Sequence, residues 1–95
     1  MKPENNAVAK HLFTFAGAVH SVYHCLANQG LSKHDHAYAH ITVCHAGSIR
    51  VIKEGKEVVL KPTSTPVFLT AGEWHEIEAL EDGTVFENIF AEGKQ

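Results

Sequence analysis

Short runs rich in β-branched and aromatic residues alternate with turn signals along most of the chain. Gly, Pro, Asn, Asp and Ser separate these runs every few residues, which is typical of short strands. The pattern predicts strands over residues 18–27, 40–45, 48–53, 56–60, 67–69, 75–80 and 84–90. Short strands at such regular spacing favour an all-β sandwich or barrel.

Two of the turn signals are predicted to close β-hairpins. Lys53-Glu54-Gly55-Lys56 separates two apolar runs, and Gly55 can adopt the positive φ that a tight hairpin turn requires. Glu81-Asp82-Gly83 is predicted to form a second hairpin for the same reason. Residues 61–66 are predicted to form a loop, because the two prolines there cannot donate to a ladder.

One segment has a competing helical interpretation. His36, His40 and Cys44 are spaced i, i+4 and i+8, which would place them on one face of a helix. However, residues 41–43 are β-branched and stiff at χ1, and a further β-branched run follows Gly47. A strand is therefore the favoured interpretation.

Size and composition limit the classes of protein that fit. With 95 residues the chain holds one folded domain, which we divide into an N-terminal arm, residues 1–17, and a β-barrel domain, residues 18–95. The net charge is -3, and the 8 Lys and Arg residues are scattered. A nucleic-acid partner is not expected, because no basic stripe is present.

The N-terminal segment and the cysteines indicate the compartment. The first residues are polar, and the apolar stretch at 12–19 is too short and too interrupted for a signal peptide or a membrane span. We therefore expect reduced thiols at Cys25 and Cys44 and a cytoplasmic protein without a membrane partner.

Histidine spacing carries the chemical signal. The chain has 8 histidines. Three of them are arranged as His34-x-His36-x3-His40, and a fourth, His75, follows Gly72-Glu73-Trp74. Composition alone would produce the triplet with a probability of about 5%. Side chains two apart on a strand point to the same side, so these histidines can converge if the strands form a closed sheet.

These segments resemble the two motifs of the cupin family, G-x5-H-x-H-x3,4-E-x6-G and G-x5-P-x-G-x2-H-x3-N. The matching positions, from residue 30 to residue 79, are His34, His36, Gly47, Gly72 and His75, while His40 stands where the family usually has Glu. The chain departs from the motifs at Gly30, which lies two residues nearer the histidines, and at Ser64, Thr70 and Ala79, which replace Gly, Pro and Asn.

The resemblance implies a cupin-type jelly-roll β-barrel with one divalent metal on His34, His36, His40 and His75. Imidazoles suit Fe, Ni, Zn or Cu better than Mg or Ca, and we expect one divalent transition metal among Fe, Ni, Zn, Mn and Cu. Without the usual Glu, the protein ligands compensate none of the charge on the metal, so we expect a small anionic ligand. Tyr38, between two of the ligands, is the candidate catalytic residue.

Two functional classes stay open. The resemblance implies dioxygenases, isomerases, lyases and epimerases among the enzymes. A metal-dependent dioxygenase-like enzyme is favoured, because no protein carboxylate shares the inner strand parity: Glu76 and Glu78 alternate with His75 and are expected to face solvent. The alternative is a non-catalytic module that binds a small acid or a sugar.

The outward parity of one strand predicts a homodimer. Ile41 and Val43 have the parity opposite to His40, so they should form an apolar outer face that needs a cover. A second subunit would supply it, or residues 12–15 could do so instead. The remaining histidines are expected to be surface or structural residues; they are His11, His20, His24 and His45.

Overall fold

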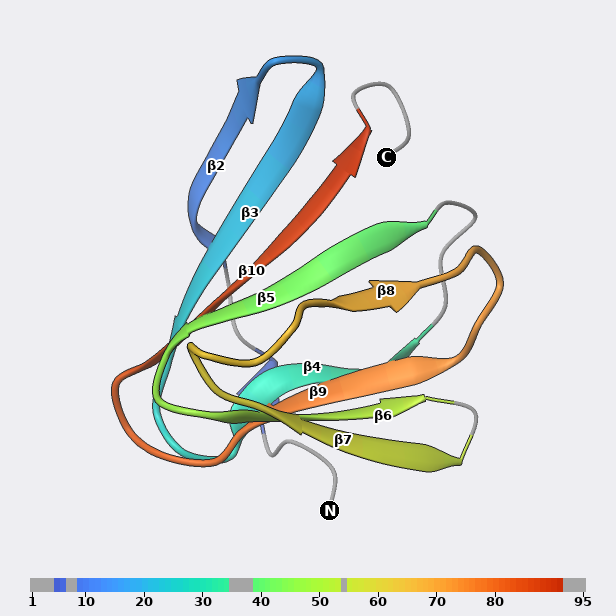
Figure 1. Cartoon of the computed structure of the whole chain (residues 1–95). Helices are drawn as coiled ribbons and strands as arrows, with labels where there is room; N and C mark the ends of the chain where they lie inside the picture. Colours follow the sequence, from blue (N-terminus) through green and yellow to red (C-terminus); the bar gives the residue numbers. More distant parts are fainter. Residues whose placement is uncertain (1–4, 7–8, 35–38, 54, 92–95) are drawn as a thin grey trace.

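The computed structural model describes residues 5–6, 9–34, 39–53 and 55–91. Within these residues the regular elements are strands, which confirms the predicted all-β class (Figure 1). No helix that could span a membrane occurs in this described part of the chain. The strands are β1 (Asn5–Asn6), β2 (Ala9–Phe15), β3 (Ala18–Cys25), β4 (Gln29–His34), β5 (His40–Ala46), β6 (Ile49–Lys53), β7 (Lys56–Leu60), β8 (Val67–Leu69), β9 (His75–Ala79) and β10 (Thr84–Ala91).

The strands form two sheets of five. The first sheet has the order β1-β4-β9-β6-β7, and the second has the order β2-β3-β10-β5-β8. The two sheets face each other as the layers of a sandwich, with the starts of β5 and β9 at the right of Figure 1. This double-sheet arrangement is the jelly roll that the sequence predicts.

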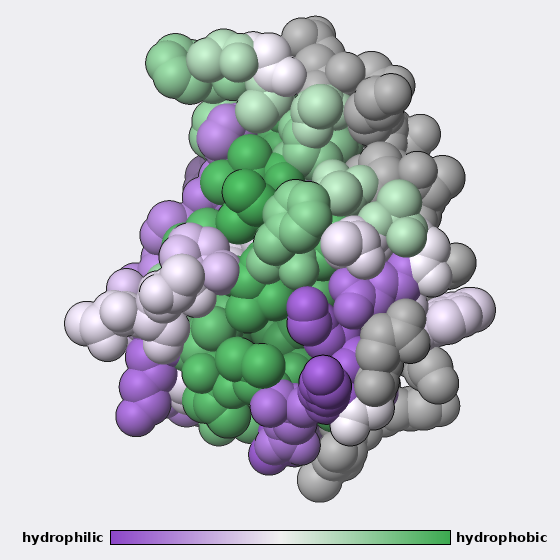
Figure 2. All heavy atoms as spheres, turned by 45° about the vertical axis from the view of Figure 1, so that its right-hand side comes forward, coloured by the Kyte–Doolittle hydropathy of each residue, from purple (hydrophilic) through white to green (hydrophobic). Residues whose placement is uncertain are grey.

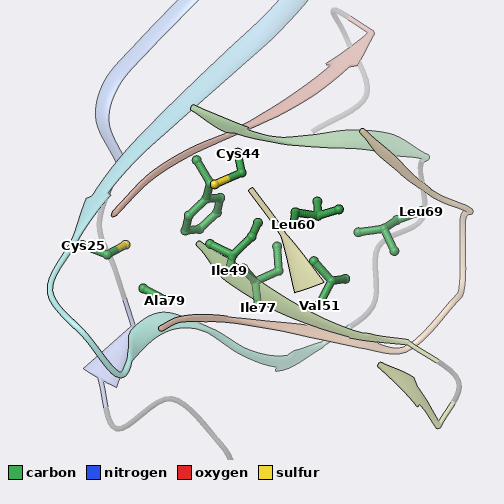
Figure 3. Packing of buried hydrophobic residues seen from close by; sticks show 9 residues of the cluster. Cys25, Cys44, Ile49, Val51, Leu60, Leu69, Ile77 and Ala79 are labelled. Carbon is green, nitrogen blue, oxygen red and sulfur yellow. The ribbon is translucent and has the colours of Figure 1, made fainter. Parts of the chain in front are cut away.

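Apolar side chains from both sheets meet between the layers. Phe86 of the second sheet and Ile49, Val51 and Ile77 of the first are completely buried. Figure 3 shows this cluster filling the space between the sheets, with Leu69 at one end. Strand alternation explains the packing, because every second residue of β5, β6 and β10 points inward.

One predicted hairpin is confirmed and the other is wrong. β6 and β7 pair from Lys53↔Lys56 to Ile49↔Leu60, and Gly55 has a φ of 77° in the turn. The turn at residues 81–83 does not close a hairpin, because β9 lies in the first sheet and β10 in the second. This turn instead carries the chain across the sandwich, and the amide of Gly83 donates to the carbonyl of Cys25 at 3.0 Å.

Three strands form where the pattern predicts none. β1, β2 and β4 have few β-branched residues, and they are recruited by pairing with neighbours in the two sheets. β2 contains residues 9–15 of the segment assigned above to an N-terminal arm, and it pairs with β3. Residues 12–15 thus widen the second sheet and do not cover its outer face.

Candidate metal centre

Two histidines from opposite sheets meet at one end of the sandwich. His40 opens β5 in the second sheet, and His75 opens β9 in the first. Their Nε2 atoms lie 3.3 Å apart, and the rings meet edge to face with centroids 5.1 Å apart. Both residues are buried, with exposed fractions of 3% and 2%. The β-branched run after His40 forms a strand, so the helical interpretation of residues 36–44 does not hold over residues 40–44.

The tautomer of His75 is determined by its backbone partner. Its Nδ1 lies 2.9 Å from the carbonyl oxygen of Glu73, and a carbonyl can only accept. Nδ1 therefore carries the proton, and in the neutral ring Nε2 keeps its lone pair. This is the arrangement in which a histidine ligates a metal through Nε2 while its other nitrogen is oriented by a carbonyl.

The side chains of Thr42 and Asn88 are compatible with the same tautomer of His40. The Thr42 hydroxyl donates to Oδ1 of Asn88 at 2.7 Å, and its oxygen lies 3.4 Å from Nδ1 of His40. With its hydrogen directed to Asn88, the Thr42 oxygen can accept from Nδ1–H of His40. Thr42 and Asn88 are buried register partners on β5 and β10, and in this tautomer the Nε2 lone pair of His40 is directed towards His75.

The facing lone pairs fit a shared cation. Neither Nε2 atom can donate to the other while both rings are neutral in these tautomers. With metal–nitrogen bonds of 2.0–2.1 Å, two adjacent ligand nitrogens are about 2.9 Å apart in octahedral and about 3.4 Å apart in tetrahedral geometry. The observed separation of 3.3 Å falls within this interval, so His40 and His75 fit two neighbouring corners of a metal coordination shell.

The other predicted site residues lie partly outside the described chain. His34 is the last residue of β4, and its Cα is the register partner of His75 across the β4–β9 ladder. His36 and Tyr38 lie outside the described residues. Among the residues that are described, no group of three or more His, Cys, Asp and Glu is arranged to hold a metal ion.

Lys53 is a charged residue at this end that the sequence reasoning missed. It shares strand parity with the buried Val51 and is the register partner of His75 on the neighbouring strand, so both side chains stand on the same face of the first sheet. Its Nζ donates to the carbonyl of Phe68 at 3.3 Å, across the opening between the sheets, and lies 3.8 Å from Oε2 of Glu73.

Glu73 contributes a carboxylate to the same rim. A hydrogen bond from the Thr70 amide lowers its pKa, against a smaller opposing effect of burial, and the nearby charge of Lys53 lowers it further. Glu73 is thus ionised near neutral pH.

Figure 2 turns this end of the molecule forward. In the part not drawn in grey, hydrophobic residues are gathered between hydrophilic ones.

One carboxylate expected in solvent is buried. Glu78 has the predicted outward parity, but it is only 2% exposed, and Oε1 accepts from Nη1 of Arg50 at 3.1 Å. The two residues are register partners on β9 and β6, which explains why Glu78 is paired with a cation. The expectation that Glu78 faces solvent is therefore wrong.

No family model and no curated protein matches the sequence. Solved structures do match the fold. An uncharacterized protein with a double-stranded β-helix domain from Klebsiella pneumoniae has a TM-score of 0.75 at 18% identity, over 93% of this chain and 74% of that one. A cupin-2 domain protein from Shewanella frigidimarina gives 0.69 at 10% identity, over 87% and 81%. KdgF from Halomonas sp. gives 0.69 at 20% identity, over 85% and 74%.

These similarities establish the architecture. The chain has the double-stranded β-helix fold of cupin-2 domain proteins, which confirms the predicted cupin-type jelly roll. At such low identities the likeness concerns the fold, and the chemistry has to be argued from the site itself.

Proposed function

We propose that this protein binds a small anionic molecule at one divalent transition metal, held by His40 and His75 together with His34 and His36. The observation that supports the proposal is the pair of facing Nε2 atoms at 3.3 Å, with each Nδ1 facing an acceptor. The register position of His34 opposite His75 brings a third predicted ligand to the same end of the first sheet.

Neutral imidazoles would leave the charge of the metal uncompensated. When bound, Fe, Ni, Zn, Mn or Cu would act as a Lewis acid with open positions for a ligand. Lys53 adds a cationic donor at the rim, where the carboxylate of Glu73 lies 3.8 Å from it. An ammonium group has three donors, so Lys53 can donate to an anion as well as to the carbonyl of Phe68.

Two classes of protein share this proposal. The favoured class is a metal-dependent oxygenase of dioxygenase type acting on a small acid, and the alternative is a non-catalytic module for a small acid or sugar. Consumption of oxygen by the Fe(II)-loaded protein, measured with an oxygen electrode against a panel of small acids and diketones, separates the two. Substrate-dependent uptake supports the oxygenase; saturable binding without uptake supports the module.

His40→Glu should weaken the binding of a simple carboxylate at least about tenfold, because the substitution adds one negative charge to the site and keeps the number of ligands. The measurement is a titration of the Co(II) forms of both proteins, followed by their visible d–d bands, with the metal held constant. Equal or tighter binding to the His40→Glu protein would contradict the preference for anions. It would not contradict the proposed metal site.

Lys53→Met should weaken the binding of the same carboxylate about fivefold, since a charge-assisted hydrogen bond at a partly exposed position contributes about 1 kcal/mol. The matched control is Lys61→Met, which removes the same charge from the exposed residue after β7, at the other end of the sandwich. If both variants weaken binding equally, Lys53 acts through the overall charge and does not contact the ligand.

A further inference from the structure

Three buried polar side chains form a row on the inner face of the second sheet. Thr42 of β5 is the register partner of Asn88 of β10, and Asn88 is the register partner of Ser21 of β3. Cross-strand partners stand on the same face of a sheet. That face is the inner one, because Asn88 shares its strand parity with the core residue Phe86. Thr42 is 0% exposed, and the other two residues of the row are 6% exposed.

The row begins beside the candidate metal centre. Oγ1 of Thr42 lies 3.4 Å from Nδ1 of His40 and 2.7 Å from Oδ1 of Asn88. With a metal–nitrogen bond of about 2 Å, the path from Asn88 over Thr42 and across the imidazole ring to a metal on Nε2 is about 10 Å long. The direct distance is shorter, so an acid of a few carbons with its carboxylate on the metal can reach the row.

Two groups of the row have no partner in the protein. Oδ1 of Asn88 accepts from Thr42, but Nδ2 of Asn88 and the hydroxyl of Ser21 form no hydrogen bond with any residue in the described part of the chain. Buried polar groups without a partner are rare, because each has given up its hydrogen bonds with water. Neither atom is among the completely enclosed polar atoms that lack a partner there. Both are therefore accessible to a small molecule.

The inner face is open to solvent next to this row. Leu12 of β2 is the register partner of Ser21, so it has the same inward parity, yet it is 68% exposed. In Figure 1 the hairpin of β2 and β3 extends past the first sheet. Among the described residues, the first sheet thus leaves this edge uncovered, and a small molecule can approach the row from β2.

We propose that Asn88 and Ser21 form a second binding point for the ligand of the metal centre, and that this ligand is a small acid with a hydroxyl or oxo group a few carbons from its carboxylate. The inference rests on the proposed function, which places the carboxylate on the metal. Nδ2 of Asn88 donates to the second oxygen of the ligand, and the Ser21 hydroxyl donates to it or accepts from a ligand hydroxyl. An acid with a methyl group in that position leaves both groups unpaired and binds more weakly.

The test compares hydroxy acids with the acids that carry a methyl group in place of the hydroxyl. The pairs are 3-hydroxypropionate and butyrate, 4-hydroxybutyrate and valerate, and 5-hydroxyvalerate and hexanoate, each titrated into the Co(II) form of the protein and followed by its visible d–d bands. At least one hydroxy acid should bind at least about tenfold more tightly than its methyl counterpart. Equal affinities within every pair would overturn the second binding point and leave the proposed function intact, whereas no binding of any of these acids would overturn both.

Variants show whether the two residues cause the preference. Ser21→Ala removes the hydroxyl, and Asn88→Asp removes the amide donor while keeping the acceptor for Thr42, so each should lower the preference at least about threefold. The preference is a ratio within a pair, so the added charge of Asn88→Asp acts on both acids alike. Ser48→Ala is the matched control, because Ser48 is equally buried but follows β5 where the chain crosses to β6. A preference unchanged in both Ser21→Ala and Asn88→Asp would overturn the proposal.

Stability separates this role from a structural one. In the metal-free protein, Ser21→Ala removes a hydroxyl that bonds to no described residue, so the urea midpoint should stay unchanged or rise. Ser48→Ala removes a hydroxyl that donates to Oε2 of Glu81 at 2.9 Å, so its midpoint should fall. An equal fall for the two variants would show that Ser21 serves the fold, and it would overturn the place of Ser21 in the binding point.

Discussion

His75→Ala should reduce metal affinity about 100-fold or more, so that the purified variant retains little metal while the parent holds about one ion per chain. Loss of even an orienting partner of a ligand typically costs 10–100-fold in affinity, and His75 is itself the proposed ligand from β9. Its ring is buried beside His40 with Nε2 already directed inward. Elemental analysis and a competition titration with a chromophoric chelator measure the difference.

The matched control for that experiment is His11→Ala, which removes an exposed imidazole from the outer face of the second sheet. His75→Gln serves as a second variant that fills more of the buried space, with circular dichroism as the check on folding. Retention of metal by His75→Ala, together with its loss from His11→Ala, would place the metal elsewhere on the molecule.

Strand parity was the part of the site that the sequence could predict. His40, Thr42 and Cys44 alternate with outward residues, and all three are buried as the pattern of β5 requires. Local alternation determines which side a residue faces, whatever the partner strand is. For the same reason, most of the predicted strands lie within two residues of the observed ones.

The pairing between strands was the part of the site that the sequence could not predict. Lys53 becomes a rim residue because β6 pairs with β9 in the register Lys53↔His75, and Asn88 reaches Thr42 because β10 pairs with β5. Both pairings join segments far apart in the chain, and no local signal specifies them. The failed hairpin at residues 81–83 has the same origin, because its turn chemistry is compatible with either a hairpin or a crossing between sheets.

Gly47→Ala should lower the free energy of unfolding by about 2–4 kcal/mol, a large fraction of the stability of a domain this small. Gly47 lies where the chain crosses from β5 to β6, with a φ of 70°. An added Cβ would collide with the hydroxyl of Thr84 and lie 2.9 Å from its Cα. Thr84 is completely buried, and its hydroxyl donates to the carbonyl of Glu81 at 2.7 Å, so the second crossing, from β9 to β10, is displaced as well.

Gly55→Ala separates the cost of the collision from the cost of the backbone conformation. Gly55 has nearly the same φ, 77°, but among the described residues beyond its chain neighbours no atom lies within 4 Å of an added Cβ. Its substitution should therefore cost only about 1 kcal/mol for the left-handed conformation. Crowding at Gly47 adds about 1–3 kcal/mol of overpacking to that cost. Urea unfolding of the parent and both variants measures the loss in the free energy of unfolding that each substitution causes. Equal destabilisation would mean that Thr84 moves away from the added Cβ at no cost in free energy, and that Gly47 is needed for its φ alone.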